Sequence, residues 1–396
     1  MATVRWRGDA PTVAQVTTAT PASIEVGDIF TLTINGKSIS YTAAATTVAH
    51  VVAGLVSAWN GSNIPKFSEV TASDTTTEAT LTADTAGRPF TVTGSTTNGG
   101  AADTQTLTVS TTTVSSRPNH WDTTANWTGG ALPGAADDVY IDDSDVSIKY
   151  GLAQSAVNLS SLHLAASFTG ELGLARTNTD GSTDYAEFSD TFLAIGAATI
   201  DIGRGEGLGS GRIQLDTGSV NAAVTIHSGG LPAEDDLPAV LWKGTGASNS
   251  LSVRDGPLGV ALFGGEAATL PTLRQVGGQV RCGAGVTLTT IDRSGHGSLL
   301  IESTAGTITQ TGGETIVLGS GAVSTVSLDG GRLDYRSGGT ITTLTLDGPG
   351  AVLDFSADLR SRTVTAATLR GSTILEPHET VTWTGGVQPA TGVQAV

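Results

Sequence analysis

Short segments in which apolar and polar residues alternate recur between residues 273 and 375, separated by glycine-rich corners. Six copies begin at Leu273, Ile291, Ile308, Leu328, Leu346 and Leu369, at steps of 18, 17, 20, 18 and 23 residues. A repeat of roughly 20 residues is typical of a solenoid, because one unit cannot bury its own apolar face and must stack on the next. The pattern predicts stacked β-coils with Val, Leu and Ile inward and Thr, Ser and Asp towards water.

Less regular segments of the same kind begin near residue 146. We expect a right-handed parallel β-helix over residues 146–383, with about 12 coils if each takes roughly 20 residues. Polar insertions at 176–190 and 229–237 are expected to protrude as loops, and they are the places to look for contacts. Residues 384–396 form a weakly patterned C-terminal tail.

A different pattern, that of a small α+β domain, covers residues 21–115 and follows an extended arm at 1–20. Alternating apolar residues flank Asn35-Gly36, the dipeptide that best suits a type I′ turn, so a hairpin is expected there. Apolar residues at helical spacing follow and predict one helix with one apolar face. We expect assembly contacts from that face and from the arm, through Trp6, Val51, Leu55 and Trp59.

The residues from Val26 to Asn60 resemble modules of bacteriophage tail and virion structural proteins. The resemblance rests on Val-Gly-Asp, on Thr-Leu-Thr-Ile-Asn-Gly-Lys, and on a Val/Ala helix that ends in Ala-Trp-Asn. It implies a virion protein, either a capsid decoration or a tail-associated protein, with capsid or tail proteins as partners. Because β-solenoids in such settings often trimerise, a homotrimer is expected.

Residues 116–145 contain a linker and an aromatic motif, with Trp121, Asn126-Trp127, two glycine-rich turns and Asp137-Asp138-Val-Tyr-Ile. This motif resembles the start of β-helical regions in bacterial surface and autotransporter-like proteins, which implies a surface adhesin or matrix protein as the alternative. Physically, Trp121 and Trp127 would cover the open end of the first coil, and Trp383 would cover the far end. A sugar-stacking site is the other interpretation of the two tryptophans.

Five carboxylates lie within nine residues, and oxygen-rich clusters can bind calcium. They belong to Asp137, Asp138, Asp142, Asp143 and Asp145. Their spacing is not that of an EF-hand loop, so a solvated strand edge that deters aggregation is the preferred interpretation. The six histidines lack metal-ligand spacing, and no cofactor is expected.

Composition narrows the possible functions. The net charge is −17, with 20 Lys and Arg against 37 Asp and Glu, which opposes nucleic-acid binding by phosphate neutralisation. The single cysteine, Cys282, excludes an intrachain disulfide. No apolar run is long enough for a membrane span, and the first residues lack the apolar core of a Sec signal peptide. We therefore expect synthesis in a host cytoplasm and a place in the virion, or alternatively on a bacterial surface.

Catalytic motifs are absent from the sequence. The glycine-rich run at 203–211 lacks the Gly-Lys-Ser/Thr of a phosphate-binding loop, and Gly-x-Ser-x-Gly does not occur. Sugar cleavage needs two carboxylates about 5–10 Å apart. Carboxylates on adjacent coils are the candidates, namely Asp292, Glu302, Glu314, Asp329, Asp334 and Asp347. A non-enzymatic structural protein is preferred, and a polysaccharide-degrading tailspike is the minority hypothesis.

Overall fold

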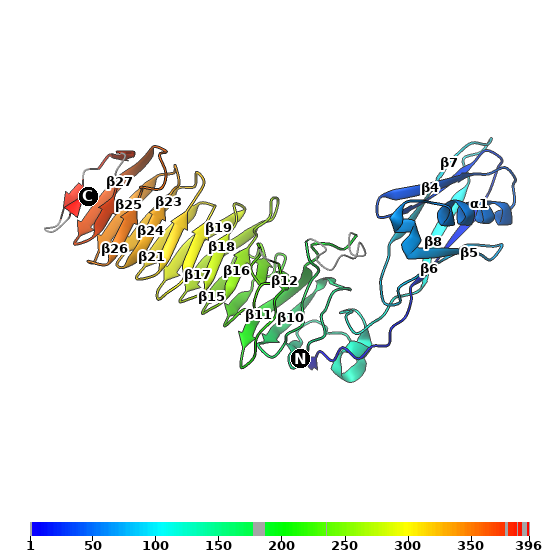
Figure 1. Ribbon diagram of the computed structural model, residues 1–396, viewed down its shortest axis with the longest axis horizontal. Coiled ribbons are helices and arrows are strands. Elements are labelled where there is room, and N and C mark those ends of the chain that lie inside the picture. Colours follow the sequence, from blue (N-terminus) through cyan, green and yellow to red (C-terminus); the bar gives the residue numbers. More distant parts are fainter. Residues whose placement is uncertain are drawn as a thin grey trace. The chain divides into compact units, whose positions relative to one another are not determined.

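The structure is a computed structural model (Figure 1) that describes residues 2–176, 187–234, 236–376, 379–385, 387–389 and 394–395. It is mainly β, with 47% strand and 6% helix. The chain forms two compact units. We call the first the solenoid unit, made of Met1–Trp6, Trp127–Gly173 and Thr191–Val396, and the second the module, made of Arg7–Asn126 and Leu174–Asp190.

The predicted mainly-β fold is confirmed: a parallel β-solenoid of about 11 turns extends from residue 138 to 383. Its strands form two rows, and within each row successive strands lie side by side along the solenoid (Figure 1). The first row contains β1 (Thr3–Arg5), β9 (Asp138–Ile141), β10 (Ala153–Ala165), β11 (Leu193–Arg204), β13 (Ala223–Ile226), β15 (Ser250–Val253), β17 (Ala268–Gln275), β19 (Val286–Arg293), β21 (Ala305–Gln310), β23 (Val323–Leu328), β25 (Ile341–Asp347), β27 (Arg362–Arg370), β29 (Val381–Trp383) and β30 (Val387–Pro389). The second row contains β12 (Ile213–Asp216), β14 (Val240–Lys243), β16 (Pro257–Val260), β18 (Gln279–Cys282), β20 (Ser298–Ile301), β22 (Glu314–Val317), β24 (Gly331–Tyr335), β26 (Ala351–Asp354), β28 (Thr373–Leu375) and β31 (Gln394–Ala395).

The register of the repeats differs at one point from the spacing seen in the sequence. Ile308 pairs with Val326, which is buried, whereas Leu328 pairs with Gln310. The step between the third and fourth turns is therefore 18 residues, not 20, and alignment on Leu328 was wrong by two positions. The cause is that the inward position of the earlier turns holds a polar residue, which the alternation of apolar residues cannot reveal.

Buried polar side chains form a ladder along one corner of these turns; we call Gln275, Arg293, Gln310 and Thr315 the corner ladder. Arg293 donates from Nε to Gln275 Oε1 at 3.0 Å and from Nη1 to Thr315 Oγ1 at 2.8 Å. Thr315 Oγ1 in turn donates to Gln310 Oε1 at 2.7 Å. Gln310 Nε2 donates to the backbone carbonyls of Gly313 and Arg332. Such side-chain donors are needed at a corner, because the chain turns there and its carbonyls cannot all pair with a neighbouring strand.

The module contains two small antiparallel sheets and one α-helix. Its elements are β2 (Val16–Ala22), β3 (Ile29–Ile34), β4 (Lys37–Thr42), α1 (Val48–Asn60), β5 (Val70–Asp74), β6 (Ala79–Ala83), β7 (Val92–Thr97), β8 (Thr106–Thr113) and the 3₁₀ turn η1 (Pro65–Glu69); η2 (Thr124–Asn126) follows at its end. The predicted hairpin joins β3 to β4, and Asn35 and Gly36 have φ of 46° and 71°, as a type I′ turn requires.

The apolar face of α1 packs against these sheets. Val51, Leu55 and Trp59 are at most 1% exposed. Trp59 Nε1 donates to the Val70 carbonyl at 2.7 Å, and its ring meets Phe67 edge to face at 4.7 Å. These residues, expected to make assembly contacts, form the core of the module and are not available to a partner surface.

The module is inserted into the first turn of the solenoid. The strand β1 pairs in parallel with β9, and the chain then leaves the solenoid unit after Trp6 and returns at Trp127. Residues 1–20, expected as one arm, therefore contribute to both units: β1 belongs to the solenoid, and β2 is an inner strand of a module sheet. The turn η3 (Thr128–Gly130) follows the return.

Candidate functional site

Asn126 ties together the chain segments at the base of the module. Its Oδ1 accepts from the backbone of Ala10 at 2.8 Å, and its Nδ2 donates to the carbonyls of Arg117 at 2.9 Å and His120 at 2.8 Å. The side chain is fully buried. This explains the Asn in the aromatic motif, because an amide supplies a donor and an acceptor at one point.

The predicted cap residues lie in three different places. Trp127 and Trp6 meet edge to face at 5.0 Å in the solenoid unit, beside β1 at the end of the first row. Trp121 is buried and belongs to the module. Trp383, in β29, is half-buried and lies 6.5 Å from Phe355 between ring centres.

Three of the five carboxylates in the acidic run at 137–145 are engaged by the protein itself, whereas Asp143 and Asp145 are exposed. Asp137 accepts from the backbone N–H of Ala2 and of Gly134, and these bonds, Ala2 first, lower the pKa of its carboxyl group. Asp138 accepts from Ser161, and Asp142 pairs with Arg5. Across the described ranges, no three acidic, His or Cys residues are grouped as a metal ion would need.

His163, on β10, lies at the centre of a polar cluster on the outer surface of the first row. Its Nδ1 is 3.2 Å from Asp201, its Nε2 is 3.0 Å from Ser161 Oγ, and its ring stacks on Tyr140 at 4.6 Å. Ser, His and Asp in this order are the arrangement of a catalytic triad, in which the residues act as nucleophile, base and orienting acid. However, Ser161 Oγ donates its one proton to Asp138 at 2.5 Å, so His163 is not placed to remove it. The cluster therefore joins neighbouring strands.

The repeat carboxylates differ in exposure: Asp329 and Asp347 are exposed and follow the paired residues Leu328 and Leu346 on adjacent turns. Asp334 pairs in register with Asp354, which was not among the residues expected from the sequence. Both are at most 2% exposed. Asp334 pairs with Arg336 at 2.6 Å and Asp354 with Arg332, so neither carboxylate is free to meet a sugar.

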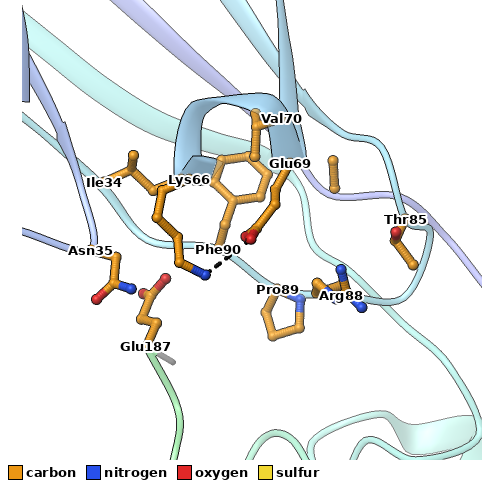
Figure 2. Close-up of a pocket in the computed structure, with 11 residues that line it drawn as sticks. Ile34, Asn35, Lys66, Glu69, Val70, Thr85, Arg88, Pro89, Phe90 and Glu187 are labelled. Carbon is orange, nitrogen blue, oxygen red and sulfur yellow. Dashed lines mark hydrogen bonds and ion pairs between the residues drawn. The ribbon is translucent and has the colours of Figure 1, made fainter. Parts of the chain in front are cut away.

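A small cavity in the module lies between the β3–β4 hairpin and η1 (Figure 2). Its volume is about 20 Å³, which is room for one water molecule. Lys66 pairs with Glu69 at 3.0 Å at its rim, and Glu187 points towards it (Figure 2). The remaining lining residues are Ile34, Asn35, Val70, Ala83, Thr85, Arg88, Pro89 and Phe90. The cavity is too small for an organic ligand.

The outer surface of the later turns carries aligned hydroxyl groups, which sequence reasoning assigned to water without noting their alignment. One column contains Thr290, Thr307, Thr325 and Thr343, paired strand to strand. The next contains Thr309, Ser327, Thr345 and Thr368. We call these two columns the hydroxyl face. All eight side chains are exposed or half-buried, and among the described residues none of their hydroxyls has a hydrogen-bond partner. The signal in the sequence is Thr-x-Thr/Ser at the repeat interval.

These features define a parallel β-solenoid protein with an α+β module inserted in its first turn. Comparison of the chain with protein-family models, with curated proteins and with solved structures gave no match. Among the described helices, none has the length and apolar character needed to cross a membrane. The function is therefore argued from the geometry.

Proposed function

We propose that the protein is a non-enzymatic structural component of a phage or phage-like particle, acting as a capsid decoration or a tail-associated protein. The solenoid is its rigid body, the module contacts neighbouring capsid or tail subunits, and the assembled form is a homotrimer. The observation that carries the proposal is the stack of about 11 turns with a continuous buried core. The resemblance of residues 26–60 to virion modules supports the choice of particle.

Two exposed leucines supply a contact point on the solenoid unit. Leu208 is 86% exposed and Leu231 is 89% exposed. Their loops are neighbours, because Gly230 N donates to the Ser210 carbonyl at 3.1 Å. Covering each leucine would contribute about 2 kcal/mol. Leu231 lies in the 229–237 loop that the sequence analysis selected for contacts.

Mass spectrometry of purified particles tests the proposal, with native mass measurement of the purified protein for the trimer. The double variant Leu208→Ser/Leu231→Ser should be depleted from particles, whereas Val276→Ser, at a residue 43% exposed, should be retained. A protein that occurs in no particle would contradict the proposal, and a double variant incorporated like wild type would show that the two leucines are not a contact point.

A bacterial surface adhesin or matrix protein is the second candidate. The hydroxyl face favours it, because it presents unpaired hydrogen-bonding groups outward. Cell fractionation separates the two, since an adhesin would be recovered with the envelope. Release of reducing sugar from host capsule would instead point to the polysaccharide-degrading alternative; we expect none, and Asp334→Asn should change nothing in that assay.

A further inference from the structure

The hydroxyl face repeats in two directions. Across the strands, neighbouring hydroxyls in one column are separated by the strand spacing of about 4.8 Å. Along a strand, Thr307 and Thr309 lie two residues apart, as do Thr343 and Thr345, which gives about 6.6 Å. The first distance is close to the shorter repeat of water oxygens on the prism face of hexagonal ice, and the second is about a tenth shorter than the longer repeat.

The two columns carry no charge over their later turns, and the next outward positions along these strands hold Asp329, Asp347 and Arg370. The second column begins as Arg274 and Asp292 on β17 and β19, and continues as Thr309, Ser327 and Thr345. The positions immediately before the first column hold the exposed residues Thr289, Ser324 and Thr342, interrupted by Gly306 before Thr307. On the next turn Thr365 is exposed and precedes Ala366, which pairs with Thr343. Charged side chains order water around themselves, whereas neutral hydroxyl and methyl groups can adopt a lattice that water already has.

The hydroxyl groups are held in place before any partner arrives. Directly inward of them, Ile308, Val326 and Leu344 are at most 1% exposed and form a continuous stack. Threonine is branched at Cβ, so its χ1 angle is restricted on a strand. A preorganised surface loses little conformational entropy when it binds a regular partner.

The alternatives fit the face less well. Polysaccharide surfaces are bound by stacking on aromatic side chains, and the outward positions of β21, β23 and β25 carry none. A second copy of the chain would bury mainly hydroxyls that have no complementary charge or apolar side chain to meet, which gives little free energy per area. A lattice of water, which can donate to and accept from every hydroxyl, is the partner that this surface matches.

We propose that the hydroxyl face binds the surface of ice, a function that goes beyond the structural role above. Its residues from Thr290 to Thr368 are the binding surface, and the module takes no part. The face would slow the growth and recrystallisation of ice crystals in contact with the protein.

The full-length protein is tested by partition into a slowly growing ice hemisphere and by inhibition of ice recrystallisation, with serum albumin as the non-binding reference. Thr325→Tyr places a ring in the middle of the face. Ser320→Tyr is the matched control, because Ser320 is exposed at a corner outside the face. Thr309→Tyr, at an exposed position, is the second face variant in case the first unfolds. Circular dichroism and the unfolding midpoint establish that each variant is folded.

Wild type and Ser320→Tyr should be enriched in ice, and the folded face variants should fall to the albumin level. Exclusion of wild type from ice, or enrichment of both folded face variants, would overturn the proposal. So would binding to microcrystalline cellulose or chitin with the same variant dependence but no enrichment in ice. If the face variants dissociate an oligomer in sedimentation, the face is an interface between copies and the proposal fails.

Discussion

Replacement of Arg293 tests whether the corner ladder holds the turns of the solenoid in register. The side chain is 1% exposed, and burial lowers the pKa of its guanidinium to about 10. It forms no ion pair with a described residue; its donors go to Gln275, Thr315 and the Gly297 carbonyl. Arg293 is thus a buried cation neutralised by dipoles, and the choice of substitute decides the outcome.

Three substitutions of Arg293 distinguish the contribution of its hydrogen-bond donors to stability from that of its charge. Arg293→Met leaves one buried acceptor, Gln275 Oε1, without a donor, whereas the Gly297 carbonyl keeps the backbone N–H of Glu314. An unmet buried acceptor costs about 1–3 kcal/mol, and removal of a desolvated cation offsets part of this, so we expect a loss of about 2 kcal/mol. Arg293→Lys keeps a charge, but the ammonium group is more strongly hydrated and its donor geometry suits the site less well. This variant should therefore lose more stability than Arg293→Met. Arg293→Gln should lose the least stability of the three, because Gln275 and Gln310 occupy the equivalent position on the neighbouring turns.

Guanidinium unfolding followed by circular dichroism gives the midpoints of the three variants. The module and the solenoid unit need not unfold together, so hydrogen exchange of peptides from β17 to β22 supplies the local measurement. The reasoning is refuted if the Met variant exchanges like wild type, or if the Gln variant is as damaged as the Met variant.

Three further outcomes are expected. Asn126→Leu should destabilise the module by about 2–4 kcal/mol, because the Ala10 N–H and the His120 carbonyl lose their partner and the Arg117 carbonyl keeps only the His120 N–H. Limited proteolysis should then cut the base of the module, while Asn119→Leu is spared. Trp59→Ala should cost the module about 3–5 kcal/mol in thermal unfolding and leave exchange in the solenoid strands unchanged. Burial first, and then Glu302, raise the pKa of the Cys282 thiol from 9.0 to about 12, so a thiol-exchange reagent should label it only after unfolding. The folded state favours the neutral thiol, so the contribution of this group to stability is full below pH 9.0 and is lost as the pH rises towards 12. Rapid labelling of the native protein at neutral pH would contradict the prediction that Cys282 reacts only after unfolding.

The alternation of apolar residues located the turns wherever the inward positions are apolar, as at Ile308 and Leu344. It failed at Leu328, because the inward residues in line with it on earlier turns are Gln310 and Arg293. A polar residue that points inward is indistinguishable in sequence from one that faces water. Only the register shows that these side chains meet corner carbonyls, so the corner ladder could not be predicted.

Long-range pairing limited the prediction of the first turn in the same way. The strand Thr3–Arg5 has three residues and one buried side chain, too little for a pattern. Its partner Asp138–Ile141 lies beyond the module segment Arg7–Asn126 in the chain. The aromatic motif marked the junction correctly as a special place, but its physical role lies with Asn126, whose three bonded partners are all distant in the sequence or hidden in a turn.

The inward position of the corner ladder and the second column of the hydroxyl face change residue type over the same turns. Where the inward residue is Arg293 or Gln310, directional hydrogen bonds help to set the register of the turn; at Leu328 and Leu346 the same inward position is apolar. Charges leave the outer column over the same turns. A substitution at Thr325 therefore alters the outer surface above Val326 without touching the corner ladder, whereas one at Thr290 lies three residues from Arg293. Loss of ice binding in Thr325→Tyr would thus report on the face itself and not on the register of the turns beneath it.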